Sequence, residues 1–295
     1  MVSAYQVAVG LVQLSLALVS CSPLDFATGT TPRSPTSDSP ANSFLPDRSS
    51  SCSQGKAVLW SNRFAERDWQ ADWQIRTAKS WGLGNSEVIN DPSHKFSKVL
   101  RVRYKAGSAS PRARRLDDTT SGGTQFFADL GLPPQDSLCL SYYVRFSKRF
   151  DFVKGGKLPG VFGGTVNDGR KIPDGTNGFS TRLMWRARGV GEVYAYLPTS
   201  QEQGTSIGRG NWQFQPGTWH HLEQQVVLNQ PGQQNGQIRV WLDGKPVLSV
   251  NGLMFRTRNA LKIEGILFST FFGGGDRSWA TPKNVYADFA NFSVY

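Results

Sequence analysis

The chain has 295 residues, with 31 glycines, 12% aromatic residues and a formal net charge of +11. This length accommodates one large domain together with an export segment. Long apolar stretches with a 3.6-residue period are nearly absent after residue 50, which excludes a mainly helical protein. The basic balance favours a polyanionic partner, and charge alone does not choose among nucleic acid, anionic lipid and acidic polysaccharide.

Residues 1–21 have the character of an export signal. The first twenty residues contain no charged side chain, and residues 7–19 form an apolar run too short to span a membrane comfortably. The positive segment that usually precedes such a run is missing. The run ends in LVSC, which resembles a bacterial lipobox with Cys21 as the lipidated residue. The alternative is an ordinary secretory signal with a cysteine at its cleavage site.

Either form of export predicts a secreted or cell-surface protein, with the membrane contacted only through such a lipid anchor. Export also argues against nucleic acid as the partner. Three cysteines are an odd number for an exported protein. Lipidation of Cys21 would leave Cys52 and Cys139 to form one disulfide. Alternatively one or both of these are reduced, with Cys139 a small buried hydrophobe in a strand.

A metal site is not expected, and neither is a cofactor. No CxxC motif occurs, and the adjacent His220 and His221 would point to opposite faces of a strand. We expect a monomer.

The chain changes character after residue 51. Residues 22–51 are rich in Ser, Pro, Thr and Asp without an apolar pattern, which predicts a disordered linker. Residues 52–295 are expected to form one domain. The dipeptide Asp243-Gly244 predicts a type I′ hairpin turn. Alternating apolar and polar residues predict strands over 138–146, 179–187, 220–228, 237–243, 247–250, 262–272 and 285–295. This pattern indicates an all-β fold of antiparallel sheets, a β-sandwich of jelly-roll type.

The most informative segment is residues 179–197, which reads as two strands joined around residues 189–191. Pairing of the strands would set Arg182 opposite Tyr194 or Tyr196. A cation beside two phenols suits an anionic sugar, although such residues are also ordinary on the solvated face of an antiparallel sheet. The alternation places one set of residues on the core face: Phe179, Thr181, Leu183, Trp185, Val193, Ala195 and Leu197. It places a polar set on the other face: Ser180, Arg182, Arg186, Glu192, Tyr194 and Tyr196.

Lys157 lies in the glycine-rich segment KGGKLPGVFGG at residues 154–164. The glycines and the proline predict a constrained loop that presents the ammonium group to a ligand. A phosphate-binding P-loop does not fit, because Leu158 follows the lysine and no helical pattern follows the loop. The alternative is a solvated lysine in a turn between strands.

Five segments of the domain resemble polysaccharide lyase family 14: GGKLPG, STRLMWR, EVYAY, GTSIGRG and FSTFFGG. The resemblance covers residues 56–295 and implies a β-jelly roll that cleaves a uronate polymer such as alginate or glucuronan. The active-site pattern of the family is a Lys in the KLPG segment, Ser-x-Arg on a strand and Tyr-x-Tyr on the next. It falls on Lys157, Ser180, Arg182, Tyr194 and Tyr196, which we therefore expect to be catalytic.

A uronate lyase removes the proton at C5, beside the carboxylate, and protonates the departing O4 oxygen. Arg182 is the expected clamp on the carboxylate, because its planar fork matches that group and its charge stabilises the enolate-like transition state. Tyr194 or Tyr196 would act as base, acid or both, since nearby cations help a phenol to ionise. Lys157 is a further candidate for base or O4 donor, and Ser180 would orient the substrate. The expected reaction is metal-independent β-elimination.

Arg209, Arg277 and Trp279 lie in glycine-rich segments and are candidates for contacting sugar and carboxylate; surface turns are the alternative. A glycoside hydrolase would need two well-placed carboxylates, whereas the polar face carries only Glu192. The remaining alternative is a non-catalytic module that binds acidic polysaccharide. The complete set of five residues argues against it, because binding alone would tolerate Phe at either tyrosine.

Overall fold

The computed structural model describes residues 51–65, 68–113, 122–166 and 171–295. The predicted export segment with Cys21, and the predicted linker up to residue 50, lie outside these residues. The described chain contains fifteen strands and little helix, including the short α-helix α1 (Trp69–Asp72). No helix in this part of the chain has the length and apolar character needed to cross a bilayer.

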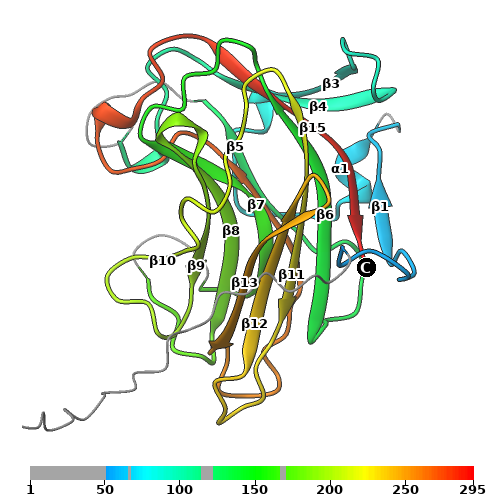
Figure 1. The fold of residues 1–295 in the computed structure, drawn as a ribbon, viewed down its shortest axis with the longest axis vertical. Helices are drawn as coiled ribbons and strands as arrows, with labels where there is room; N and C mark the ends of the chain where they lie inside the picture. The colour runs from blue at the N-terminus through cyan, green and yellow to red at the C-terminus, as the bar shows by residue number, and fades with distance from the viewer. Residues whose placement is uncertain (1–50, 66–67, 114–121, 167–170) are drawn as a thin grey trace, which may run out of the picture. The chain divides into compact units, whose positions relative to one another are not determined.

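The strands form two antiparallel sheets (Figure 1). The eight-stranded sheet, here the β6 sheet, has the order β13-β12-β11-β6-β15-β4-β3, with β1 paired to β15. Its members are β1 (Trp60–Asn62), β3 (Ser86–Asn90), β4 (Lys98–Tyr104), β6 (Ser137–Phe146), β11 (Trp219–Val227), β12 (Gly236–Leu242), β13 (Lys245–Leu253) and β15 (Val285–Val294).

The seven-stranded sheet, here the β8 sheet, has the order β10-β9-β8-β7-β14-β5-β2. Its members are β2 (Ile75–Trp81), β5 (Thr124–Ala128), β7 (Gly155–Gly164), β8 (Gly178–Arg186), β9 (Gly191–Tyr196), β10 (Thr205–Ile207) and β14 (Gly265–Thr270). The predicted antiparallel β-sandwich is therefore confirmed.

The core lies between the two sheets, because alternate residues of the strands face one another there. Tyr142 on β6 is fully buried and donates a hydrogen bond across the sandwich to the Pro159 carbonyl on β7, at 3.1 Å. Gln224 on β11 likewise donates to the carbonyl of Thr181 on β8, at 2.7 Å. These bonds satisfy buried polar groups and hold the two sheets in register.

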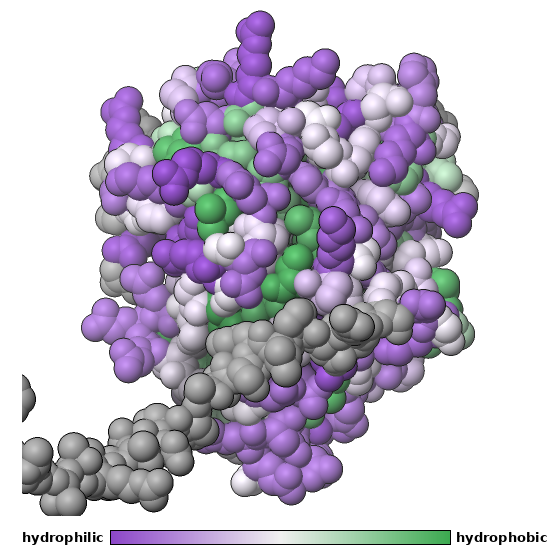
Figure 2. Space-filling view, viewed as in Figure 1, coloured by the Kyte–Doolittle hydropathy of each residue, from purple (hydrophilic) through white to green (hydrophobic). Residues whose placement is uncertain are grey.

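Hydrophilic residues cover most of one face of the molecule, with a strip of hydrophobic residues down its middle (Figure 2). The edge strands β10 and β13 carry partly buried apolar side chains that pack against the core: Ile207, Val247, Val250 and Leu253.

Of the strands that the alternation pattern predicted, most lie within one or two residues of their observed bounds, whereas β1 to β5, β7 and β10 were not predicted. The predicted hairpin turn is confirmed, since Asp243 and Gly244 have positive φ angles of 52° and 76°. The strand predicted over 262–272 is shorter, spanning Gly265–Thr270.

The prediction of a loop around Lys157 is wrong. Residues 155–164 form strand β7 near the middle of the β8 sheet. A Cβ atom on Gly156 would lie only 2.0 Å from the ring of Trp185 on the neighbouring strand. Glycine is needed there so that a large core side chain can pack against the backbone, which is a different reason from turn formation.

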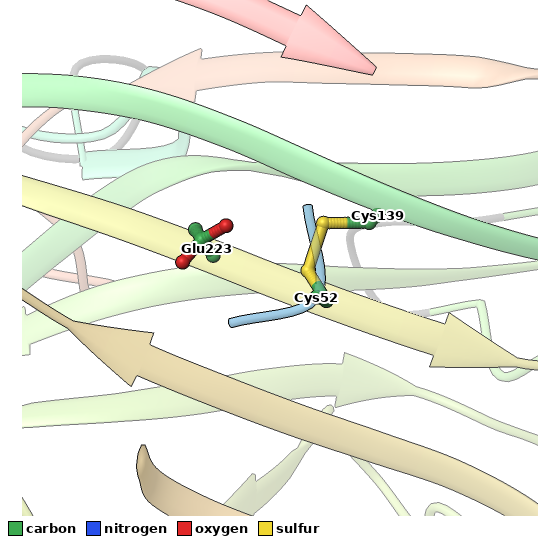
Figure 3. A group of neighbouring side chains, drawn as sticks. All are labelled: Cys52, Cys139 and Glu223. Carbon is green, nitrogen blue, oxygen red and sulfur yellow. A yellow bond between two sulfur atoms is a disulfide. The ribbon is translucent and has the colours of Figure 1, made fainter. Parts of the chain in front are cut away.

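Cys52 and Cys139 form a disulfide that closes a sequence separation of 87 residues. The carboxylate of Glu223 lies beside them, with its oxygen and both sulfurs within 4.8 Å of one another (Figure 3). The two sulfurs are bonded to each other and are not thiolates, so this group is not a metal site. Glu223 instead accepts hydrogen bonds from Ser51 and Ser53, at 2.6 and 2.5 Å.

Candidate active site

The polar face of β8 and β9 is set by their pairing register. Ser180 lies opposite Tyr196, Arg182 opposite Tyr194, and Met184 opposite Glu192. Of the two partners that the sequence left open for Arg182, the structure selects Tyr194. The intervening residues of both strands are buried in the core cluster, so the face with the polar residues points away from the β6 sheet.

Lys157 joins this face from β7, opposite Met184. Its Nζ lies 2.9 Å from the Met184 sulfur and 3.5 Å from the centroid of the Tyr194 ring, and the residue is only 9% exposed. A register shift between Leu158 and Gly160 adds one residue to β7 beside the lysine. Bulges of this kind bend a strand and redirect side chains.

The two tyrosine rings form an edge-to-face pair with their centroids 5.7 Å apart. Cations surround the pair: the Arg182 guanidinium lies 5.5 Å from the Tyr196 centroid, and that of Arg186 lies 5.7 Å from the Tyr194 centroid. Together with Lys157, these groups create a positive field around both phenols. Such a field favours a bound carboxylate.

Arg182 is 2% exposed and is hydrogen-bonded to strand β14, which lies two strands away in the same sheet. Its Nη1 donates to the Ser269 hydroxyl at 3.3 Å, and Ser269 donates to Gln125 at 2.9 Å. Among the residues that the structure describes, its Nε has no hydrogen-bond acceptor. Through Ser269 the guanidinium is thus fixed beside the Tyr196 ring, where its charge can stabilise an anionic ligand.

Glu192 is fully buried and neutralises two arginines at the edge of this face. One carboxylate oxygen accepts from Arg186 at 2.8 and 2.5 Å. The other accepts from the Ser206 hydroxyl and from Arg209, both at 2.6 Å. Burial by itself would raise the pKa of Glu192, but the hydrogen bonds from Arg186 and Ser206 hold it below its ordinary value of 4.5. Glu192 is therefore an ionised anchor for the arginines, and not a proton donor.

A cavity of about 360 Å³ opens over this face. Several of its lining residues carry no signal in the sequence, although alternation on β8 points to Met184. Gly204 also lines it and packs closely against the Tyr194 ring, since a Cβ atom at this position would lie only 2.7 Å from the ring. The lining comprises Lys157, Met184, Arg186, Tyr194, Gln203, Gly204, Ser206, Arg209, Gly274 and Trp279.

The other predicted site residues divide into two groups. Ser180 and Tyr196 lie next to the cavity, buried on the same face as Arg182. Arg209 and Trp279 line it from the connections outside β8 and β9, whereas Arg277, in the same short helical turn as Trp279, does not. The structure therefore brings together all five residues predicted to be catalytic, and their chemical roles stay a prediction.

The profile of polysaccharide lyase 14 matches residues 92–292. The chain belongs to this family. The resemblance drawn from the sequence is thus confirmed, and no curated protein adds to it, because none matches significantly.

Solved structures resemble this family member over most of its length. A marine alginate lyase from Aplysia kurodai has a TM-score of 0.68 and 30% identity, covering 81% of this chain and 99% of its own. An alginate lyase from a Chlorella virus has a TM-score of 0.63 and 23% identity, covering 76% and 93%. An endo-β-1,4-glucuronan lyase from Trichoderma reesei has a TM-score of 0.54 and 11% identity, covering 81% and 95%. The similarity to the Chlorella virus enzyme and to the Trichoderma reesei enzyme supports the fold alone.

We expect Glu192→Gln to lower the free energy of unfolding by about 3 kcal/mol, because it leaves the arginine charges beside it unbalanced in a buried site. Denaturant unfolding near pH 7 measures the loss. Since the folded-state pKa is depressed, the carboxylate stabilises the protein above its ordinary pKa of 4.5 and loses this effect as the pH falls through the folded value. The difference in free energy of unfolding between wild type and Glu192→Gln should therefore become smaller at acidic pH.

A matched control is Glu87→Gln, which removes a carboxylate from a surface pair with Arg103 whose side chains are 37% and 53% exposed. Its effect should stay within about 1 kcal/mol. Equal effects of the two substitutions would contradict an anchoring role for Glu192.

Proposed function

We propose that the protein is a lyase that cleaves a uronate polysaccharide by β-elimination. The observation that carries this proposal is the convergence of Lys157, Arg182, Tyr194 and Tyr196 on one sheet face beside a cavity. The similarity to the Aplysia kurodai alginate lyase supports it. That similarity also favours alginate over glucuronan as the polymer, because the glucuronan lyase is only 11% identical.

Arg182 carries the role of carboxylate clamp. Its positive charge can neutralise the uronate carboxylate, which makes the C5 proton easier to remove. Ser269 and Gln125 hold the guanidinium in place, so little rearrangement is required when the substrate enters.

Tyr194 and Tyr196 are the proposed proton-transfer groups. Both are buried on the face that receives the sugar, within reach of the positive charges described above. One phenolate takes the C5 proton, the C4–O4 bond breaks as the C4–C5 double bond forms, and a protonated group returns a proton to O4. Lys157, stacked on the Tyr194 ring, stabilises the ionised phenol or supplies that second proton. Ser180 orients the substrate beside Tyr196.

We propose that this reaction proceeds without a metal ion. The positive charges of Lys157 and Arg182 supply the neutralisation that a divalent cation would otherwise provide. Among the described residues that line the cavity, none carries a carboxylate, and nearby Glu192 is bonded to two arginines. Activity should be unchanged after treatment with a chelator.

The decisive test is a panel of purified polymannuronate, polyguluronate and glucuronan, with absorbance of the unsaturated uronate as the readout. A rise in absorbance on at least one polymer is expected, with the largest rise on an alginate block. Binding of polymer without any rise would support the non-catalytic module instead. A neutral polysaccharide is the negative control.

We propose further that the protein works outside the cytosol, as a monomer. The disulfide supports export, because such bonds persist in oxidising compartments. Lipidation at Cys21 would attach the domain to a membrane through the preceding linker. Mass analysis of the mature N-terminus would show whether Cys21 carries a lipid.

A further inference from the structure

A second cavity, of about 240 Å³, lies on the side of the sandwich opposite the candidate active site. Ser141 and Tyr143 on β6 contribute to it, and they alternate with the core residues Leu140 and Tyr142. They therefore point away from the β8 sheet. We call this cavity the rear pocket and define it by Arg63, Ser141, Tyr143, His221, Asn291 and Ser293.

The polar groups of the rear pocket are held in place by contacts on rigid strands. Ser141 Oγ and His221 Nε2 are hydrogen-bonded at 2.7 Å, and the His221 ring stacks on Tyr143 with centroids 4.4 Å apart. Lys95 Nζ lies 4.8 Å from the centroid of the same Tyr143 ring. Such preorganisation lowers the entropy cost of binding a ligand.

A bulge in β15 contributes the next wall. Ala290 pairs with Tyr143 and Ser293 with Ser141, so two residues of β15 oppose one residue of β6. One of these two is Asn291, which has a φ of 47° and lines the pocket. Asn tolerates this left-handed conformation better than most residues. The bulge thus supplies an amide, a group that both donates and accepts hydrogen bonds, at the pocket.

The disulfide positions the remaining part of the pocket lining. Cys52 is bonded to Cys139 on β6, and the adjacent Ser53 lines the pocket (Figure 3). Ser53 also donates to the buried carboxylate of Glu223 at 2.5 Å. The covalent link and this hydrogen bond hold the segment before β1 against the β6 sheet.

We propose that the rear pocket is a second, non-catalytic site that binds a uronate residue of the same polysaccharide; this inference rests on the proposed function. Hydroxyl groups of Ser141 and Ser293 and the amide of Asn291 match the hydroxyls of a sugar. The exposed Arg63 supplies a guanidinium for its carboxylate. A long polymer held at this site stays near the active site, which raises its effective concentration there.

The test uses the double variant Arg63→Ala/Asn291→Gly, in which glycine keeps the positive φ of position 291. In a Tyr196→Phe background, which cleaves the polymer far more slowly, its affinity for long polyuronate should fall about tenfold, the loss expected from one charge-assisted hydrogen bond. With Tyr196 present, the double variant should raise KM on the polymer and leave kcat/KM on a uronate trisaccharide unchanged. Lys245→Ala, which removes an exposed cation from β13, is the matched control and should leave polymer affinity unchanged.

The outcomes separate the rear pocket from the proposed function. Unchanged polymer affinity in the double variant overturns the rear site, whether or not the enzyme cleaves polyuronate. An equal loss of affinity for a neutral polysaccharide overturns the assignment to uronate. If no polymer is cleaved by the wild type, the proposed function fails, while a selective loss of polyuronate binding in the double variant still supports the site.

Discussion

Tyr196→Phe and Lys157→Ala are each expected to reduce turnover on a cleaved polyuronate by about a hundredfold or more, the usual scale for losing an acid–base group. Phe keeps the packing of the Tyr196 ring, which is 5% exposed and edge-to-face with Tyr194, so the loss would report the hydroxyl. Lys157→Ala removes the cation 3.5 Å from the Tyr194 ring. Initial rates of absorbance increase measure both effects.

The matched control for the tyrosine is Tyr286→Phe, on the β6 sheet and away from the cavity. Arg101 lies over the Tyr286 ring at 3.6 Å, a contact that Phe retains, so its rate should remain within about twofold of wild type. Near-wild-type turnover in both Tyr196→Phe and Lys157→Ala would rule out the proposed catalytic group.

Arg182→Lys is expected to lower kcat by about a hundredfold or more, with a smaller change in KM, because the clamp acts most strongly on charge that develops in the transition state. Lysine keeps the positive charge but lacks the planar fork that matches a carboxylate. Arg182→Ala should be at least as impaired, and added guanidinium ion should restore part of its rate. Steady-state kinetics with and without guanidinium measure these effects.

The control for this prediction is Arg101→Lys, which alters the buried pairing with Asp288 on the β6 sheet, where N and O lie 2.7 Å apart. Arg101→Lys should lower the free energy of unfolding while leaving kcat near the wild-type value. If Arg182→Lys instead lowers only the free energy of unfolding and not kcat, Arg182 is a structural residue and the clamp is wrong.

The surroundings of Glu192 also bear on the alternative of a glycoside hydrolase. Such an enzyme needs one carboxyl group that holds a proton and a second that is ionised. Hydrogen bonds from Arg186 and Ser206 keep the pKa of Glu192 low, so it is poorly suited to be the acid. In the part of the chain that the structure describes, no carboxylate lines the cavity itself.

The sequence by itself determined which residues share a face of β8 and β9. This was possible because the two-residue period of a strand is a local property, and Ser180, Arg182, Tyr194 and Tyr196 all obey it. The same period located eight of the fifteen described strands of the sandwich. The DG dipeptide located a hairpin because its backbone preference is equally local.

Only the tertiary structure decided the pairing register, the position of Lys157 and the walls of both cavities. These depend on contacts between residues far apart in the sequence. Gly156 looked like part of a turn, but its missing side chain makes room for Trp185 on the next strand. The anchoring of two arginines by Glu192, and the meeting of Ser141 with His221, likewise exist only after strands from different parts of the chain have paired.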